Sequence, residues 1–301
     1  MADKRIKDLA TTATSPAGDD FFAIDGATSN SRKILADSFL QDAPTDATLY
    51  GRKDGAWEEA ASPDDVPLVP TFVYDGTAGT TQFIYGDIPD NWQQNNSDLT
   101  QLYIGNSVTS IGSYAFTYCS GLAGDLVIPN SVTSIGSYAF QYCSGFDGNL
   151  FIGNSVTTIG DNAIRNCSGL TGSLVIPNSV TYIGVSSFQD CSGFSGNLVI
   201  PNSVTLIGNS SFIGCTGLTS VIVPSPTTII DDYPFTSCTN LTAAYLNQPI
   251  GSLGSYALAG SGITNVYIGP DATGYTLGSG QTIGGQSGIT VSIWTNYPNV
   301  P

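Results

Sequence analysis

Six cysteines recur at an almost constant interval, and this interval restricts the possible folds more than any other feature of the sequence. Four successive spacings are 24 residues and the fifth is 23. The cysteines are Cys119, Cys143, Cys167, Cys191, Cys215 and Cys238. A period of about 20–50 residues is typical of stacked repeats, whose single units are too small to bury an apolar face alone. The spacing therefore predicts a solenoid in which each cysteine fills the same buried position of one coil.

Apolar residues keep the same interval, which strengthens this prediction. The valines of the pattern are Val108, Val132, Val156, Val180 and Val204. The isoleucines are Ile111, Ile135, Ile159, Ile183 and Ile207. The large residues three positions before each cysteine are Phe116, Phe140, Ile164, Phe188, Phe212 and Phe235. We expect about seven apolar side chains to be buried in each coil, where only a neighbouring coil can cover them.

The unit spanning residues 126–149 shows how one coil is expected to fold. Val127 lies between two apolar residues, so a short strand would point it outward and its neighbours inward. Gly136 marks a tight turn, for which we expect a positive φ. Phe140 and Cys143 are three positions apart, which fits one helical turn with its apolar side facing the core. The predicted fold class is a repeat solenoid of about seven coils, built of short strands and helical turns.

Outside the repeat, the sequence divides into shorter segments. Residues 1–60 do not repeat, and we interpret them as a small α+β module. Residues 61–70 contain three prolines and are expected to form a stiff linker. We interpret residues 71–101 as a cap on the first coil, residues 102–268 as the repeat solenoid and residues 269–301 as the C-terminal cap.

Within the N-terminal module, the pattern predicts two strands, one helix and one hairpin. The strands are expected at Phe21–Ile24 and Ser31–Ile34, and the helix at Leu35–Leu40. The hairpin is expected at Tyr50–Trp57, with an Asp-Gly pair at its tip. So small a module has little core of its own and needs a partner or oligomerisation for stability.

Charge is scarce and unevenly distributed. The chain has 8 basic and 24 acidic residues and a net charge of −16 at pH 7. Seven of the bases lie within the first 53 positions, and Arg165 is the only base that follows. A surface so poor in Lys and Arg cannot neutralise phosphates, which argues against nucleic-acid binding by the repeat. The same shortage argues against attraction to an anionic membrane.

Neither export nor membrane insertion is expected from the sequence. No apolar stretch is long enough to span a bilayer, and the first residues lack the apolar segment of a signal peptide, so we expect synthesis in a cytoplasm. The cysteines are expected to be buried free thiols, although coils about 4.8 Å apart would also allow bridges between neighbours. With no histidine and no CxxC pair, we expect no metal or cofactor.

The repeat unit resembles a known family. Residues 126–146 read LVIPNSVTSIGSYAFQYCSGF, in which Ile-Pro, Val-Thr-Ser-Ile-Gly, Ala-Phe and Cys follow in order. This unit resembles the BspA-type leucine-rich repeat of bacterial surface antigens, over about residues 102–268. The resemblance implies adhesion and surface recognition, with no catalytic residues. The chain departs from the family in an extra glycine-containing link in most units and in the lack of an export signal.

The N-terminal region resembles a different family. Residues 42–57 follow the pattern Asp-Ala-Pro-x-Asp-x-x-x-Tyr-Gly-Arg-x-x-Gly-x-Trp, which is similar to the opening segment of phage tail fibre and virion-attachment proteins. The resemblance implies that residues 1–60 dock to other virion tail proteins and that the solenoid faces a host cell-surface receptor. It also implies a homotrimer, located in the virion tail and made in the cytoplasm of the host bacterium. The docking residues would be Phe21, Phe22, Tyr50, Arg52 and Trp57.

Four tyrosines are the candidate ligand-binding residues. They lie two positions on either side of the inward-facing Phe116 and Phe140, so they should point outward. They are Tyr114, Tyr118, Tyr138 and Tyr142. Exposed aromatic rings suit the apolar faces of sugars, and each hydroxyl adds a polar contact. The alternative is that the rings only pack on one another or on the cap.

A second outward ladder is expected on the strands. Its members are Tyr103, Val127, Phe151, Val175 and Val199. A continuous exposed apolar row usually marks an interface, so our first interpretation is a contact between subunits. Burial under the chain's own cap or linker, and contact with a receptor, are the alternatives. A ladder of asparagines is interpreted as turn-forming, with amides that bond the local backbone. Its members are Asn130, Asn154, Asn178 and Asn202.

No arrangement of acidic residues points to catalysis, so the chain is not expected to be an enzyme. Cleavage of a polysaccharide needs two carboxylates at a set separation. The aspartates of the repeat occupy different positions in different coils, and an adjacent pair in an extended segment would diverge. These aspartates are Asp125, Asp147, Asp161, Asp190, Asp231 and Asp232.

The resulting functional prediction is a phage tail fibre or receptor-binding adhesin. Its solenoid would recognise a glycan or protein on the host surface. One alternative is a virion structural or decoration protein that uses the solenoid as a spacer. The other alternative is a tail-associated enzyme that depolymerises polysaccharide.

Overall fold

The computed structural model describes residues 86–294 apart from positions 226 and 228, and six strands before them. Those six are β1 (Phe21–Ala23), β2 (Lys33–Leu35), β3 (Leu49–Lys53), β4 (Ala56–Ala60), β5 (Thr71–Asp75) and β6 (Thr81–Ile84). The chain forms two compact units, Met1–Val69 and Pro70–Pro301, which are described separately.

The first unit contains two antiparallel strand pairs. β1 pairs with β2, so that Phe22 lies opposite Ile34. β3 pairs with β4 and places Arg52 opposite Trp57, which confirms the predicted hairpin. The described part of this unit contains no helix. The proline-rich linker lies outside the described residues. So does the expected helix, apart from its first residue, Leu35, which belongs to β2.

The second unit begins with an antiparallel sheet in the order β6-β5-β7, where β7 is Leu99–Tyr103. Between β6 and β7, residues 86–98 already have the geometry of a coil. Ile88 bridges to Ile111 of the next coil, and Asn91 and Asn95 have φ angles of 59° and 64°. Trp92 packs edge-on against Phe116, with ring centroids 5.6 Å apart. The apolar core therefore starts before residue 102.

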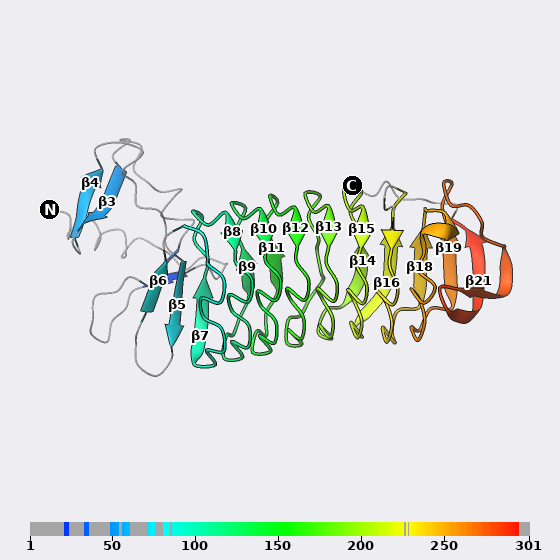
Figure 1. Ribbon diagram of the computed structural model, residues 1–301, viewed down its shortest axis with the longest axis horizontal. Coiled ribbons are helices and arrows are strands. Elements are labelled where there is room, and N and C mark those ends of the chain that lie inside the picture. The colour runs from blue at the N-terminus through cyan, green and yellow to red at the C-terminus, as the bar shows by residue number, and fades with distance from the viewer. Residues whose placement is uncertain are drawn as a thin grey trace. The chain divides into compact units, whose positions relative to one another are not determined.

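One side of the coils is a continuous parallel sheet of six two-residue strands. Each strand pairs with its counterpart in the next coil, so that Ile135 lies between Ile111 and Ile159. In spatial order the strands are β8 (Ser110–Ile111), β10 (Ser134–Ile135), β12 (Thr158–Ile159), β13 (Tyr182–Ile183), β15 (Leu206–Ile207) and β17 (Ile229–Ile230). Figure 1 shows these strands side by side along the stack.

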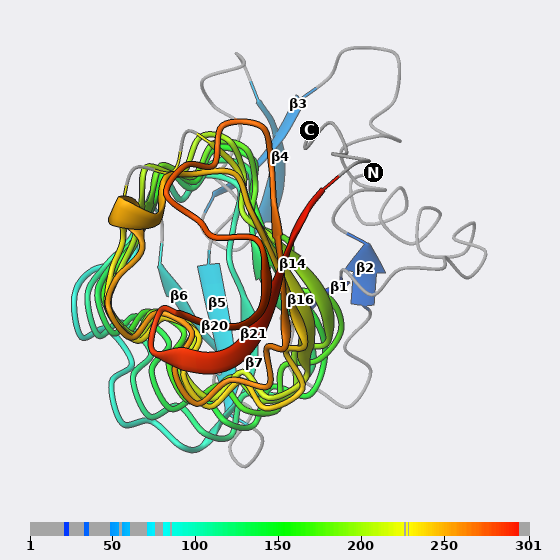
Figure 2. The same cartoon turned by 90° about the vertical axis from the view of Figure 1, so that its right-hand side faces the viewer.

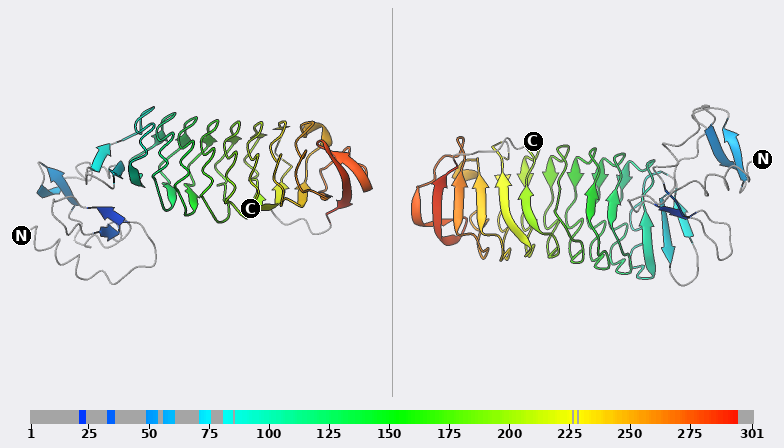
Figure 3. Two further views of the ribbon diagram at one scale, coloured as in Figure 1. Left: turned by 90° about the horizontal axis from the view of Figure 1, so that it is seen from below. Right: turned by 180° about the vertical axis from the view of Figure 1, so that it is seen from behind.

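The predicted outward-facing strands form a second side, which is interrupted. β9 (Leu126–Ile128) pairs with β11 (Leu150–Ile152), and residues 174–176 of the next coil are not in a strand. A sheet in the order β14-β16-β18-β19-β21-β20 then runs to the end of the described chain (Figure 3). Its strands are β14 (Gly196–Val199), β16 (Leu218–Val223), β18 (Ala243–Leu246), β19 (Asn265–Ile268), β20 (Gly278–Ile283) and β21 (Gln286–Ile293).

The stack contains about eight coils, slightly more than the seven expected. Seen end-on in Figure 2, successive coils from β8 to β19 overlie one another. The stack ends at the antiparallel pair of β20 and β21, in which Ile283, Ile289 and Val291 are buried. No helix in the described part of the chain is long and apolar enough to cross a bilayer.

The predicted helical turn between Phe140 and Cys143 is wrong. The described residues contain no α-helix, and their one helical element is the short 3-10 helix η2 (Ile250–Ser252). The third side of each coil is a series of turns, in which the Cys143 N–H still donates to the carbonyl of Phe140. It also bonds to its neighbour: the Phe116 N–H donates to the carbonyl of Ala139, 2.7 Å away. The tyrosines at 114 and 118 have φ angles of 58° and 62°, which a right-handed helix cannot contain.

The core is built from one file of cysteines and one of phenylalanines. Phe116 and Phe140 stack with centroids 5.2 Å apart, and Phe188 and Phe212 do the same at 5.4 Å. All six cysteines are buried and free, which confirms the prediction of unbridged thiols. Full burial of each ring contributes about 1.5–3 kcal/mol to stability, because the next coil excludes water from it.

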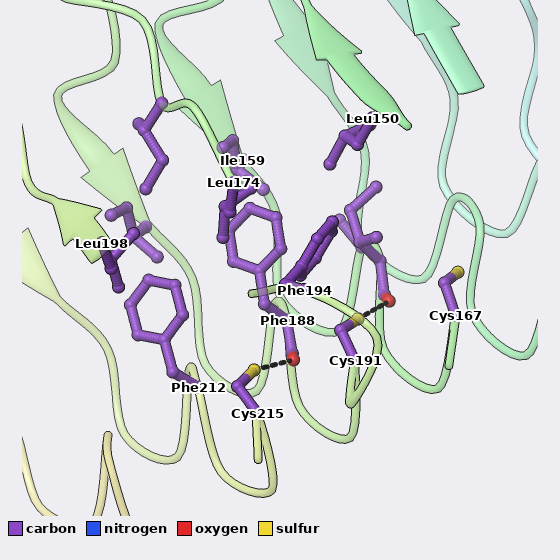
Figure 4. Close-up of a cluster of buried hydrophobic side chains, with 14 of the residues drawn as sticks. Leu150, Ile159, Cys167, Leu174, Phe188, Cys191, Phe194, Leu198, Phe212 and Cys215 are labelled. Atoms are coloured by element: carbon purple, nitrogen blue, oxygen red, sulfur yellow. Dashed lines mark hydrogen bonds between the residues drawn. The ribbon is translucent and has the colours of Figure 1, made fainter. Parts of the chain in front are cut away.

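Each thiol also links two coils through a hydrogen bond. Cys215 Sγ donates to the carbonyl of Phe188 at 3.1 Å, and Cys191 Sγ donates to that of Ile164 at 3.0 Å (Figure 4). The same bond occurs at the other four cysteines. Burial raises the pKa of Cys119 and of Cys238 to about 12. It raises the pKa of Cys167, Cys191 and Cys215 well above the usual range.

Gly136 serves close stacking and does not have the expected positive φ. A Cβ at Gly136 would lie 2.6 Å from the backbone of Gly112 in the preceding coil. Gly145 is tighter still, since its Cβ would lie 2.2 Å from the carbonyl oxygen of Ser120. These glycines are needed because the backbones of adjacent coils touch there.

A threonine ladder, which the sequence analysis missed, adds a further link between coils. In each member the backbone N–H and the hydroxyl donate to the same carbonyl, that of the threonine 24 residues earlier. The donors are Thr133, Thr157, Thr181 and Thr205. Their regular spacing was visible in the sequence, but hydroxyl donation along a stack has no distinctive motif.

Candidate functional site

The four predicted tyrosines come together as two stacked pairs on neighbouring columns of the third side. Tyr114 and Tyr138 stack with centroids 4.5 Å apart and ring planes 4° apart. Tyr118 and Tyr142 stack with ring centroids 4.7 Å apart and ring planes 5° apart. Tyr118 is 48% exposed and Tyr114 is 37% exposed, while the other two are half-buried. The rings therefore pack on one another and still offer accessible surface.

The backbone explains why these tyrosines point outward. All four have φ angles between 58° and 62°, the left-handed region that most residues avoid at a cost of roughly 1–2 kcal/mol. The three residues between Tyr114 and Tyr118 are buried, and one of them, Thr117, donates its Oγ1 hydroxyl to the carbonyl of Tyr138 in the next coil. The intercoil ladder holds each ring at a fixed height above its neighbour.

The tyrosine patch ends at the coil that contains Arg165. The two columns continue there with Asn162 and Asn166, at φ angles of 56° and 59°. Arg165 Nη1 donates to Asn162 Oδ1 at 3.2 Å, while its Nε is buried without a hydrogen-bond partner. The Tyr142 N–H donates to the carbonyl of Arg165 at 2.8 Å, so the guanidinium-bearing coil directly follows the tyrosine coil.

Further aromatic pairs were missed by the sequence analysis. Tyr233 and Tyr256 continue the column of Tyr114 and stack at 5.1 Å with parallel rings. Tyr256 is 49% exposed. Tyr233 lies two positions before Phe235, and Tyr256 two positions before Leu258, as Tyr114 does before Phe116. Extending the count of two positions to these later coils would have found them.

The outward ladder on the strands is present and longer than predicted. Val127, Phe151 and Val175 are exposed, Val175 by 66%. Tyr103 and Val199 are half-buried. Strand register adds three members that the analysis did not include, Ile222, Tyr245 and Tyr267. We call these eight residues the outer ridge. At the C-terminal end of the ridge, Tyr245 stacks on Tyr267 with ring centroids 4.8 Å apart. The ring centroid of Tyr245 also lies 4.5 Å from that of Trp294.

Several aspartates act as links between coils. Asp125 Oδ1 accepts the backbone N–H of Asn149 at 2.5 Å, and Asp147 Oδ1 accepts that of Gly124 at 2.8 Å. The asparagine ladder shows the same contact at Asn130, whose Oδ1 accepts the N–H of Asn154 in the next coil and not of its own turn. The described residues contain no cluster of three or more metal-ligating side chains.

Asp87 shows the same linkage at the first coil. Its Oδ1 accepts the hydroxyl and the N–H of Thr109 and the N–H of Ser110, each at 2.8 Å. These hydrogen bonds, led by the Thr109 hydroxyl, lower the pKa of Asp87 below its usual value. They favour the ionised carboxylate, which suits a structural acceptor and not a general acid.

The proposed docking residues lie on the described strands of the first unit. Phe21 and Phe22 are in β1, Tyr50 and Arg52 in β3, and Trp57 in β4. Their role in docking stays a prediction.

The repeat region matches the family model of the BspA type leucine rich repeat region. Six copies are found within residues 86–192 and 170–276, which together span more than half of the chain. No curated protein matches the chain at a significant level.

Solved structures with the same kind of fold are similar to this chain. A leucine-rich repeat protein of T. pallidum is 23% identical with a TM-score of 0.50, over 72% of this chain and 88% of that one. A leucine-rich repeat protein of Bacteroides ovatus is 26% identical with a TM-score of 0.42, over 68% and 58% respectively. A leucine rich cell surface protein of Faecalibacterium prausnitzii is 19% identical with a TM-score of 0.41, over 77% and 89%. The first similarity shows the fold.

Proposed function

Because this chain belongs to the BspA-type leucine-rich repeat family, we propose that its solenoid is a non-catalytic recognition module for a cell-surface ligand. The observation that supports this best is the patch of two adjacent tyrosine pairs, which the intercoil ladder holds in place and which is partly exposed. Rigid aromatic rings lose little conformational entropy on binding and combine an apolar face with a hydroxyl. A sugar of a surface glycan fits that combination.

More specifically, we propose that the protein is a phage tail fibre. Residues 1–60 attach the chain to the virion, and the solenoid meets a receptor on the host. The support is the resemblance of residues 42–57 to the opening segment of virion-attachment proteins. Assembly in the cytoplasm of the host bacterium and location in the virion tail follow from the same resemblance.

The tail-fibre proposal includes self-association, in the trimer usual for that class, through the outer ridge. The support is the distribution of charge. Residues 86–294 contain 10 aspartates and one arginine, so two copies repel each other across most of their surfaces. The positions two residues before each ridge residue hold residues such as Gln101, Asn149 and Asn197. Among them only Asp125 is charged. The ridge is thus the face where identical chains meet with least repulsion.

Adsorption of the purified full-length chain to host cells tests the recognition function. Bound protein should saturate and should compete with virions for the same cells. Absence of competition at saturating protein would leave a structural or spacer role in the virion. Release of reducing ends from host polysaccharide would instead indicate a depolymerase. Sedimentation in the same buffer measures the oligomeric state, and a monomer would contradict self-association.

A further inference from the structure

Residues 86–294 contain one basic residue, Arg165, and 10 aspartates. It forms no ion pair with any described carboxylate, although aspartates occur in its own coil and the next. Asp161 Oδ1 instead accepts the N–H of Val185 and the hydroxyl of Tyr182. Asp190 Oδ2 accepts the side-chain amide of Gln189. Within residues 86–294 the guanidinium is therefore a cation without a described counter-ion, although this part of the chain is strongly anionic.

Arg165 is also partly removed from water and fixed in place. The residue is half-buried, and its Nε is fully covered without a partner. Asn162, itself only 7% exposed, holds Nη1. A partly desolvated charge attracts an anion more strongly than a charge in water does. Held in this way, the guanidinium is preorganised to receive a carboxylate.

The aromatic surface stops where this cation begins. Tyr138 and Tyr142 are the last rings of their stacks, and the next coil offers Asn162 and Asn166 in their place. Asn166 Oδ1 is buried without a hydrogen-bond partner. An aromatic platform, amide side chains and a single guanidinium thus occur together in two successive coils.

From this juxtaposition we propose that Tyr138, Tyr142, Asn162, Arg165 and Asn166 form a subsite for a carboxylate-bearing sugar residue of a surface polysaccharide. The inference rests on the proposed recognition function and specifies its ligand class. The apolar face of the sugar ring packs on the terminal tyrosines, and its carboxylate pairs with the guanidinium. Neutral and phosphate-only ligands lack one of these two features.

The test applies the labelled full-length chain to an array of acidic and neutral bacterial polysaccharides. We expect binding to members that contain uronic or other carboxylate sugars, and its loss when the carboxyl groups are chemically reduced to alcohols. Binding that survives this reduction, binding confined to neutral members, or binding to no acidic member overturns the inference. Adsorption to cells still decides the recognition function on its own, so the two failures are distinguishable.

Variants designed from the repeat separate charge from folding. Arg165→Gln introduces the residue present at the same position of both flanking coils, Gln141 and Gln189. It should weaken binding of the carboxylate polysaccharide by about 10-fold or more, the usual effect of losing a charged hydrogen bond. Arg165→Lys, which retains charge without the planar fork, should recover part of that loss.

Tyr142→Asn is the matched test of the aromatic wall. Asparagine occupies the equivalent position of the next coil and tolerates the positive φ. The control is Tyr233→Asn, the same change at a stacked, exposed tyrosine four coils away from Tyr138 in its column. The inference requires weaker binding for Tyr142→Asn and unchanged binding for Tyr233→Asn, with both chains still unfolding cooperatively. Equal effects would contradict a site at Arg165.

Discussion

The inner files of this solenoid and its outer columns follow different rules, although both repeat with every coil. Inside, cysteine and a large apolar residue return in each coil from Phe116 to Cys238, and all are fully buried. Outside, the positions equivalent to Tyr114 and Tyr118 change to asparagine, serine, aspartate and glycine while keeping the same positive φ. The backbone is therefore specified from within, and the outer side chains are free to differ. The outer side chains can thus change along the stack while the backbone conformation stays the same.

The largest expected effect is alkaline unfolding through the cysteine file. Folding favours the neutral thiol because burial raises its pKa, so this stabilisation is complete below the ordinary value of about 9. It is lost as the pH rises from about 9 toward 12, by about 1.4 kcal/mol per thiol and pH unit. Urea unfolding at several pH values should show this fall in the free energy of unfolding, to which the five thiols with raised pKa values contribute.

A variant with alanine at Cys119 and Cys238 is the control for that titration. Its free energy of unfolding should be lower at neutral pH, yet should fall less steeply above pH 9, because two fewer thiols ionise on unfolding. An unchanged slope would show that the thiols are not sealed in the native state.

The second prediction concerns the phenylalanine file. Phe140→Ala leaves a cavity between two stacked rings and should lower the free energy of unfolding by about 3–5 kcal/mol. The matched outer change, Tyr233→Asn, removes a ring of similar size and should lower it by about 1 kcal/mol or less, since that ring is partly exposed. Equal losses in urea titrations would erase the distinction between inside and outside.

The buried repeat positions were predictable from the sequence, but the backbone conformation between them was not. Spacing identified the buried valines, isoleucines, phenylalanines and thiols because each must meet its copy in the next coil. The helical turn was wrong because Phe140 and Cys143 also fit a turn with left-handed residues, and intercoil hydrogen bonds decide between them. Tyrosine rarely adopts a positive φ, so nothing in its identity revealed that conformation.

The candidate site was predictable only in part. Counting two positions from each phenylalanine gave the four tyrosines, whereas the role of Arg165 depends on neighbours from other coils. Its Asn162 contact and its buried Nε are consequences of tertiary packing. The repeat register placed Arg165 in the coil after Tyr138 and Tyr142, but it did not show which groups the guanidinium contacts.

The smallest expected effect concerns the backbone of the outer columns. Ser237 is exposed with a φ of 61°, and the preceding coil has Gly214 at the equivalent position. Ser237→Gly should raise the free energy of unfolding by up to about 1 kcal/mol, because relief of the left-handed strain exceeds the added entropy of the unfolded chain. A lower thermal midpoint for this variant would show that the serine side chain is needed there.

The division between inner files and outer columns is tested most directly by measuring both properties on one series of proteins. Wild type, Phe140→Leu and Tyr142→Asn would each be titrated with urea and with a carboxylate-bearing polysaccharide. We predict that Phe140→Leu loses stability but binds as wild type does while folded, and that Tyr142→Asn loses binding with little change in stability. If the two variants lose both properties in the same proportion, fold and recognition are not carried by separate parts of the coil.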